Sequence, residues 1–221
     1  MTTQNPAESP EAPSSPLPTG PQVAVLVYPG VNELELGLVL SLLTPLGRPG
    51  SVGTTDAAAL SVARTRGSVM CAGGLVCTPQ LIFAAAPPAL AGVLIPGGLG
   101  AQKAGRDPAT REFLAQARAK GLPLGVCGSG VLLAGEAGLL EGRNVGCPAA
   151  LADTVWGYLP ADLQTDRVVH DTPADRPALY TGPGGLGGSP VILALISRLW
   201  GTEQAGQAAV RVGLNPPPKG P

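Results

Sequence analysis

The stretch Leu122–Leu140, LPLGVCGSGVLLAGEAGLL, decides the fold that we expect. Its first residues, Leu122–Val126, form a short apolar run that is typical of a strand covered on both faces. A glycine-rich turn follows, and the pattern from about Ser129 to Ala137 indicates a helix. Cys127 stands between the two. A side chain on such a tight strand-to-helix turn is held up into a cleft, as in the nucleophile elbow.

Strand and helix patterns alternate on both sides of this stretch. Asp107 and Pro108 are typical of the first residues of a helix, as N-cap and N1. The alternation predicts a three-layer α/β sandwich with a mainly parallel sheet. The other expected strands are Gln22–Tyr28, Gly92–Ile95, Val168–Val169 and Ala178–Tyr180, with a hairpin between Val62 and Thr78; the expected helices follow Asn32, run from Asp107 to Lys120, and span Pro190–Trp200 and Thr202–Val210.

The composition predicts one domain between two tails. The chain has 221 residues, of which 32 are glycine and 25 are proline. Residues 1–21 and 216–221 are rich in proline and have little to bury, so we expect them to be disordered. Residues 22–215 are apolar enough to form a single domain with a sizeable core.

The charge and the cysteine pattern exclude several functions. With 14 Lys and Arg against 15 Asp and Glu, and no basic cluster, we expect neither nucleic acid nor a membrane as partner. Four cysteines at unpatterned spacings and a single histidine predict neither a disulfide scaffold nor a metal site. The start of the chain has no apolar segment typical of a signal peptide, so a reducing cytoplasm is the expected compartment.

Cys127 is the strongest candidate for chemistry. A helix N-terminus beside it would lower the pKa of its thiol and make it nucleophilic at neutral pH. The alternative is a small buried cysteine in a glycine-rich turn. Gly97 and Gly98 follow another strand, and their N–H groups together with that of Gly128 could form an oxyanion hole. The alternative there is simply a glycine-rich turn.

Glu35 also has two interpretations. Asn32 and Glu35 have the spacing of a capping box, which needs no catalysis. A carboxyl at the end of the first strand could instead hydrogen-bond to the sulfur of Cys127. His170 lies in a polar stretch that resembles a strand running out to solvent, so a Cys–His dyad is the weaker hypothesis. Cys71 and Cys77 are interpreted as packing residues of the expected hairpin.

These strand ends, in this order and spacing, resemble the ThiJ/PfpI superfamily of class I glutamine-amidotransferase-like proteins. The resemblance covers about Val23 to Leu214, and the cysteine elbow followed by AGLLEGR is its most specific part. The segment PGVNELEL (29–36) and the segment GLLEGR (138–143) are most similar to the branch that holds isonitrile hydratases and the amidase-like domains of AraC-type regulators. The segments that carry it are VLVYPGVNELEL (25–36), GLVCTPQLIFAAAPPALAGVLIPGG (74–98), GLPLGVCGSGVLLAGEAGLLEGRNVGCPAALADTVW (121–156) and YTGPGGLGGSPVILALISRLWGTEQAGQAAV (180–210).

The resemblance implies a flavodoxin-like fold, a homodimer, and neither a metal nor an organic cofactor. It implies that Cys127 is the nucleophile and that Glu35 is its carboxyl partner. It further implies that Gly98 and Gly128 supply the oxyanion-hole amides. Many members have a histidine where this chain has Cys147, and others have one beside the nucleophile, where this chain has Gly128. A Cys–His protease or glyoxalase mechanism is therefore not expected.

The expected function is a cofactor-free enzyme that uses Cys127 to add water to a small electrophilic molecule, similar to isonitrile hydratase. One alternative is a redox or electrophile sensor in which Cys127 is oxidised. Another is a binding domain that has lost catalysis. In relatives the side chain at the position of Cys147 faces the nucleophile across the cleft. The resemblance therefore offers two alternatives, a disulfide between Cys127 and Cys147 or a roomier, more apolar pocket.

Overall fold

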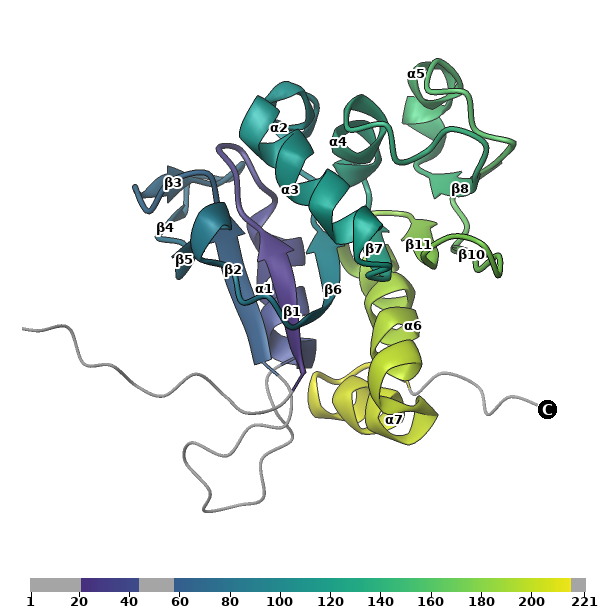
Figure 1. The fold of residues 1–221 in the computed structure, drawn as a ribbon. Helices are drawn as coiled ribbons and strands as arrows, with labels where there is room; N and C mark the ends of the chain where they lie inside the picture. The colour runs from purple at the N-terminus through teal and green to yellow at the C-terminus, as the bar shows by residue number, and fades with distance from the viewer. Residues whose placement is uncertain (1–20, 44–57, 216–221) are drawn as a thin grey trace, which may run out of the picture.

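A central sheet of seven strands organises the computed structural model, which describes residues 21–43 and 58–215 (Figure 1). The strand order is β10-β11-β7-β6-β1-β2-β5, and every neighbouring pair is parallel except β10 and β11. Parallel strands need crossovers, and the helices between them cover both faces. The strands are β1 (Gln22–Leu26), β2 (Ala58–Ala63), β5 (Leu81–Ile82), β6 (Leu90–Ile95), β7 (Leu124–Cys127), β10 (Val169–Asp171) and β11 (Leu179–Gly182).

The helices form two groups, one on each face of the sheet. One group comprises α1, α6 and α7, which contact one another, and the other comprises α2, α3 and α4. Figure 1 shows α3 in front of the sheet and α1 behind it. The predicted three-layer α/β sandwich is therefore confirmed. The helices are α1 (Glu33–Leu43), α2 (Ala101–Arg106), α3 (Pro108–Ala119), α4 (Gly130–Glu136), α5 (Ala152–Trp156), α6 (Ser189–Trp200) and α7 (Thr202–Arg211).

Local signals explain where the helices begin. Asn32 Oδ1 accepts hydrogen bonds from the N–H groups of Leu34 and Glu35, at 3.0 and 3.3 Å, and so caps α1. Asp107 caps α3 in the same way, accepting from the N–H of Thr110 at 3.1 Å, and Pro108 is the first helical residue. Both starts agree with the sequence prediction.

Two small sheets lie outside the central one. The hairpin of β3 (Val69–Met70) and β4 (Val76–Cys77) is antiparallel, as predicted. The pair β8 (Asn144–Cys147) and β9 (Asp162–Thr165) is parallel and was not predicted.

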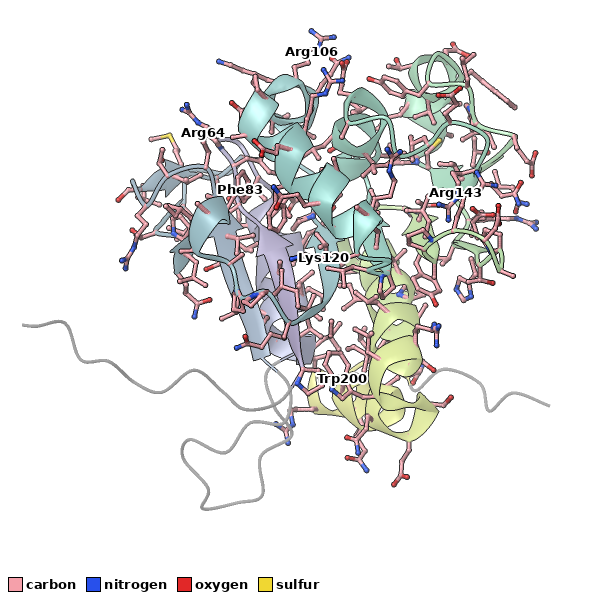
Figure 2. The ribbon with its side chains drawn as sticks, viewed as in Figure 1. Arg64, Phe83, Arg106, Lys120, Arg143 and Trp200 are labelled. Carbon is pink, nitrogen blue, oxygen red and sulfur yellow. The ribbon has the colours of Figure 1, made fainter. Side chains whose placement is uncertain are left out.

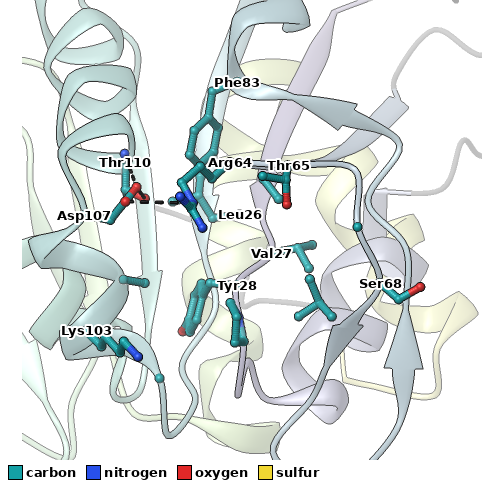
Figure 3. A pocket seen from close by; sticks show the side chains of 16 residues that line it. Leu26, Val27, Tyr28, Arg64, Thr65, Ser68, Phe83, Lys103, Asp107 and Thr110 are labelled. Atoms are coloured by element: carbon teal, nitrogen blue, oxygen red, sulfur yellow. Dashed lines mark hydrogen bonds and ion pairs between the residues drawn. The ribbon is translucent and has the colours of Figure 1, made fainter.

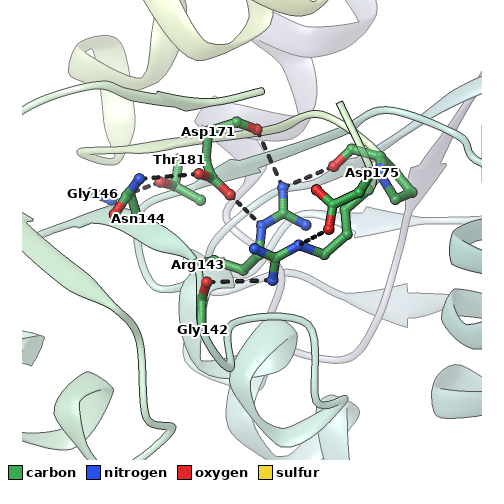
Figure 4. A network of polar contacts seen from close by, with 9 residues as sticks. Gly142, Arg143, Asn144, Gly146, Asp171, Asp175 and Thr181 are labelled. Atoms are coloured by element: carbon green, nitrogen blue, oxygen red, sulfur yellow. Dashed lines mark hydrogen bonds and ion pairs between the residues drawn. The ribbon is translucent and has the colours of Figure 1, made fainter. Parts of the chain in front are cut away.

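A buried ion pair fastens the β8 side of the molecule (Figure 4). Arg143 Nε donates to Asp171 Oδ2, and both side chains are almost fully buried. Arg143 Nη2 also donates to the carbonyl of Pro177 at 2.8 Å, and Asn144 donates to Asp171 Oδ1 at 3.2 Å. Because each charge has several partners, the pair joins β8 to β10 and to the loop before β11.

Apart from Pro21, the predicted tails 1–21 and 216–221 lie outside the described residues, and the single domain over 22–215 stays a prediction. Within 21–43 and 58–215, no helix combines the length and the apolar character that crossing a membrane requires.

Candidate active site

The candidate site lies where the carboxyl ends of β1, β6 and β7 meet. From β1 the chain crosses to β2 and β5 on one side and then returns to β6 on the other side of β1, so the topological switch point of the sheet lies between β1 and β6. Ligands of open α/β sheets bind at such points. The loop after β1 joins the loop after β6 through a bridge between Val31 and Gly98 and a hydrogen bond from the N–H of Asn32 to the carbonyl of Gly97, at 2.8 Å.

Cys127 is not on the turn but is the last residue of β7. It pairs with Gly182 of β11, and its side chain is 0% exposed. Its sulfur is 3.8 Å from the carbonyl oxygen of Gly188, to which the thiol donates. Cys127 is therefore a buried strand residue directed toward the start of α6.

The protonation of Cys127 differs from the sequence expectation. Burial raises the pKa of the Cys127 thiol far above its ordinary value, and the nearby Glu35 carboxylate raises it further. The predicted lowering of this pKa by a helix N-terminus is therefore wrong, because burial of the sulfur disfavours the charged thiolate. In this geometry Cys127 is a protonated thiol at neutral pH.

Gly128 occupies the apex of the strand-to-helix turn. Its φ is +53°, in the left-handed region, whereas Cys127 has ordinary strand geometry. A Cβ atom at Gly128 would lie 3.0 Å from Glu35 Oε1 and 2.7 Å from Gly184 Cα. A side chain at position 128 would therefore face the carboxylate of Glu35. The sequence predicted that the side chain of Cys127, one position earlier, would do so.

Glu35 is a buried carboxylate held by two loops. Its Oε2 accepts from the N–H of Gly97 at 2.6 Å, and its Oε1 accepts from the N–H of Gly185 at 2.7 Å. The side chain is 3% exposed and does not turn back to the N–H of Asn32. The Asn32 half of the predicted capping box is therefore present, whereas the carboxylate of Glu35 binds the loops after β6 and β11 instead.

The two amides that the resemblance assigned to an oxyanion hole both have acceptors within the protein. The N–H of Gly98 donates to Ser129 Oγ at 2.8 Å, and the N–H of Gly128 donates to the carbonyl of Gly182 at 3.0 Å. Ser129 Oγ also donates to the carbonyl of Gly98 at 3.2 Å. These contacts tie the turn after β7 to the turn after β6.

Tyr28 closes the site from the β1 side. Its hydroxyl donates to the carbonyl of Pro96 at 2.5 Å. Burial raises its pKa well above the ordinary value, and the Glu35 carboxylate and Cys127 add to this effect. Tyr28 therefore stays neutral and acts as a hydrogen-bond donor.

Cys147 and His170 lie in β8 and in the edge strand β10. Cys147 ends β8 and is fully buried, and the Cys127 thiol makes its hydrogen bond to Gly188 and not to Cys147. His170 is exposed in the edge strand β10, where its ring packs edge to face on Tyr180 at 5.2 Å between centroids. Among the described residues, no group of three or more His, Cys, Asp and Glu is arranged to hold a metal ion.

Several residues around this site were not found from the sequence. Gly185 helps to hold the carboxylate, Ser129 fastens the two turns, and Gly188 covers the sulfur. Gly97 was singled out for its N–H, which binds the carboxylate of Glu35. The loop after β11 carried no recognisable chemistry, because its contribution is a backbone N–H. A signal for the true apex did exist, since Gly130 stands two residues after Gly128, as in the nucleophile-x-Gly part of the elbow pattern.

A cavity of about 360 Å³ lies beside Tyr28, at the carboxyl ends of β1 and β2 (Figure 3). Its volume is in the range of small-molecule sites. Cys127, Glu35, Gly98 and Gly128 do not line it. The lining combines apolar side chains (Leu26, Val27, Val69, Phe83) with polar and charged ones (Tyr28, Arg64, Thr65, Ser68, Lys103, Asp107, Thr110).

A mainly parallel three-layer sandwich with a strand-to-helix elbow at its switch point defines a class of flavodoxin-like proteins. Comparison with known proteins gives the family. The sequence model of the DJ-1/PfpI family matches residues 21–174, and the chain belongs to this family. The resemblance to the ThiJ/PfpI superfamily is thereby confirmed.

Individual relatives agree with this assignment. The isonitrile hydratase of Pseudomonas putida is 29% identical over 204 residues, which are 89% of this chain and 80% of that protein. A THiJ/PfpI family protein from Pseudomonas syringae has a similar structure, with a TM-score of 0.74 and 27% identity, over 98% of this chain and 84% of that one. Drosophila melanogaster DJ-1beta shares the fold, with a TM-score of 0.73 and 18% identity, over 88% and 98% of the two chains.

Proposed function

We propose that this protein binds a small organic molecule and does not use a cysteine thiolate for turnover. The observation that carries the proposal is the elbow: its apex, Gly128, has no side chain, and the preceding Cys127 is fully buried. A cysteine nucleophile must meet its substrate and must ionise. Cys127 meets neither requirement in this geometry, so the family site is retained as a scaffold without its nucleophile.

The cavity beside Tyr28 supports the binding part of this proposal. Phe83 and Leu26 offer apolar surface, while Arg64 and Lys103 bring two positive charges to the same opening (Figure 3). One carboxylate, that of Asp107, faces Arg64 at 3.9 Å. A ligand that complements this lining has a small apolar body and one negative group, so we propose a small carboxylate as the ligand class.

Ligand-observed NMR with benzoate, and with uncharged benzamide as its counterpart, tests this proposal. We expect saturation transfer to benzoate with the wild-type protein, a weaker signal with Lys103→Gln, and none with Ala104→Leu, which fills the cavity. Lys120→Gln is the matched control, because Lys120 lies outside the cavity and well away from Arg64 (Figure 2). Equal signals from benzoate and benzamide would reject the carboxylate class. Binding that survives Ala104→Leu would reject the cavity.

A second candidate is hydration of an isonitrile, which the relative from Pseudomonas putida favours. In that reaction water adds across the terminal carbon, R–NC + H₂O → R–NH–CHO. If Cys127 carried it, wild-type protein incubated with an alkyl isonitrile would form the N-formyl amine, and Cys127→Ser would not. Our proposal predicts no product above the protein-free blank from either protein, measured by chromatography with mass detection.

A stress-sensing role through oxidation of Cys127 is the third candidate, and a structure of Toxoplasma gondii DJ-1 is described as oxidized. The burial of Cys127 argues against it, because an oxidant must reach the sulfur. We also propose that the protein is a homodimer, as the resemblance implies, and that it works in the cytoplasm, where its four free cysteines would stay reduced.

A further inference from the structure

The hairpin β3–β4 brings two thiols together on one face. Val69 pairs with Cys77, and Cys71 follows Val69 by two residues, so Cys71 and Cys77 point to the same side. Their sulfur atoms are 3.7 Å apart. Both cysteines are free, and no role in the candidate site uses them.

The two thiols differ in their surroundings. Cys71 is 3% exposed, whereas Cys77 is partly exposed. Burial raises the pKa of Cys71 to about 11, with further contributions from the sulfur of Cys77 and the carboxylate of Glu33. Cys71 is therefore a thiol that can donate its proton to Cys77, and Cys77 is the sulfur that a small oxidant reaches.

We propose that Cys71 and Cys77 form a redox pair, which a hydroperoxide converts into a reversible intrachain disulfide. In the first step the Cys77 sulfur attacks hydrogen peroxide, the O–O bond breaks, and Cys77 becomes a sulfenic acid while water leaves. In the second step the Cys71 sulfur attacks the sulfenic sulfur, the S–O bond breaks, and Cys71 gives up its proton as a second water leaves. In sum, two thiols and H₂O₂ give one disulfide and two waters.

The hairpin is anchored close to the geometry that this bond requires. A disulfide has a sulfur–sulfur distance of about 2.05 Å, so the two atoms must approach by about 1.7 Å. The N–H of Gly30 donates to the carbonyl of Met70, and the N–H of Ala72 donates to the carbonyl of Val31, both at 2.8 Å. These bonds fix the β3 strand, so rotation of the two cysteine side chains can supply most of the approach.

The turn of the hairpin is fastened as well. The N–H of Cys71 donates to the carbonyl of Leu75 at 2.7 Å, which closes the turn. The Glu33 carboxylate lies over Gly73, and hydrogen bonds from the backbone N–H groups of Glu33 itself and of Gly73 lower the pKa of Glu33. The sulfur atoms are thus held side by side by backbone contacts on both strands, which favours the intrachain disulfide over one between chains.

Peptide mapping tests the pair directly, because trypsin separates Cys71 and Cys77 from the other two cysteines. Cys71 and Cys77 fall in one peptide, Gly67–Lys103, while Cys127 falls in Gly121–Arg143 and Cys147 in Asn144–Arg167. The full chain is treated with hydrogen peroxide, unfolded, alkylated without reductant and digested. We expect peptide Gly67–Lys103 to lose both alkyl groups and the mass of two hydrogen atoms, and to recover both alkyl groups after dithiothreitol.

Single variants separate a resolving cysteine from a bystander. In Cys71→Ser, Cys77 should accumulate as sulfinic acid, because no second thiol condenses with its sulfenic form. In Cys77→Ser, Cys71 should stay alkylatable, and Cys147→Ser is the matched control that should keep the disulfide. Circular dichroism verifies that each variant is folded. Oxidation of Cys127 before this pair, sulfinic Cys77 beside a free Cys71 in the wild type, or a disulfide between chains would each overturn the proposal.

Discussion

Glu35 connects the loops that form the candidate site. Its two oxygens accept N–H groups from the loops after β6 and β11, at 2.6 and 2.7 Å, although it lies in the first turn of α1. Hydrogen bonds to a charged acceptor are stronger than neutral ones. One buried carboxylate therefore holds three segments that are far apart in the sequence.

We predict that Glu35→Gln lowers the free energy of unfolding by about 2 kcal/mol, because an amide NH₂ must then face a backbone N–H that has lost its acceptor. Urea denaturation measures the change. Glu203→Gln, in the first turn of the exposed helix α7, is the control and should be nearly neutral. A neutral Glu35→Gln would return Glu35 to the capping box, in which glutamine serves equally well.

Gly128 makes a prediction of its own. In Gly128→Ala, the new Cβ meets Gly184 Cα at 2.7 Å in a backbone with positive φ, so we expect a loss of roughly 2 kcal/mol or more in unfolding free energy. Gly121→Ala is the control, because Gly121 also has a positive φ but nothing lies near its Cβ position. That variant should lose only about 1 kcal/mol. Equal losses would mean that the apex is not crowded.

The position of the apex explains how far the sequence could predict the site. The sequence singled out the turn and the carboxylate, which lie side by side in the structure, because a strand, a glycine-rich turn and a helix leave clear patterns. It misplaced the apex by one residue, since the end of β7 is fixed by pairing between Cys127 and Gly182, which are distant in the chain. The N–H groups that hold Glu35 leave no side-chain signal at all.

At the scale of elements, β8 depends on a buried charge. Arg143, just before β8, binds Asp171 at the end of β10, and both side chains are almost fully buried (Figure 4). We predict that Arg143→Met costs about 3 to 5 kcal/mol of unfolding free energy, because it leaves the Asp171 carboxylate buried without its partner.

The control for this variant is Arg176→Met. Arg176 forms a 3.8 Å pair with Asp175 at the surface, where both side chains are exposed. Exposed pairs contribute about 0–1 kcal/mol, so this variant should be nearly as stable as the wild type. Thermal unfolding followed by circular dichroism compares the two. If both arginine variants lose the same free energy of unfolding, the buried ion pair contributes no more to stability than the exposed one.

The elements that the sequence missed share a physical reason. β1, α3 and α6 were predicted because they are long and have clear apolar patterns or caps. β9 reads DLQT and has few apolar residues, so only its pairing with β8 makes it a strand. Helix α2 has only six residues, one of which is Gly105, and so short a segment shows no helical pattern in the sequence. Tertiary contacts thus define the pieces that local propensity does not.

At the scale of the whole molecule, apolar side chains gather on the outer face of the hairpin. Met70 and Val76 pair across the strands and are 64% and 57% exposed. They point away from Cys71 and Cys77, so a partner on this face would leave the thiol pair uncovered. A second copy of the chain on this face would remove the apolar surface from water.

We therefore predict a particle of twice 22.0 kDa in analytical ultracentrifugation. Val76→Glu should shift the protein toward monomer, because burying an unpaired charge opposes association. Val210→Glu is the matched control, since Val210 is equally exposed but lies in α7. A monomeric wild type, or dissociation by both variants, would contradict this arrangement.

The reactivity of Cys127 in the native protein tests the central claim most directly. Brief labelling with iodoacetamide at neutral pH, followed by tryptic mapping, reads Cys127 in Gly121–Arg143 separately from the pair in Gly67–Lys103. Because burial raises the pKa of Cys127 and closes it to solvent, we predict that it labels more slowly than Cys77. Its rate should also keep rising with pH beyond about 8.5, the ordinary pKa of a thiol. Fastest labelling at Cys127, with a rate that levels off near neutral pH, would show a working thiolate and contradict the account.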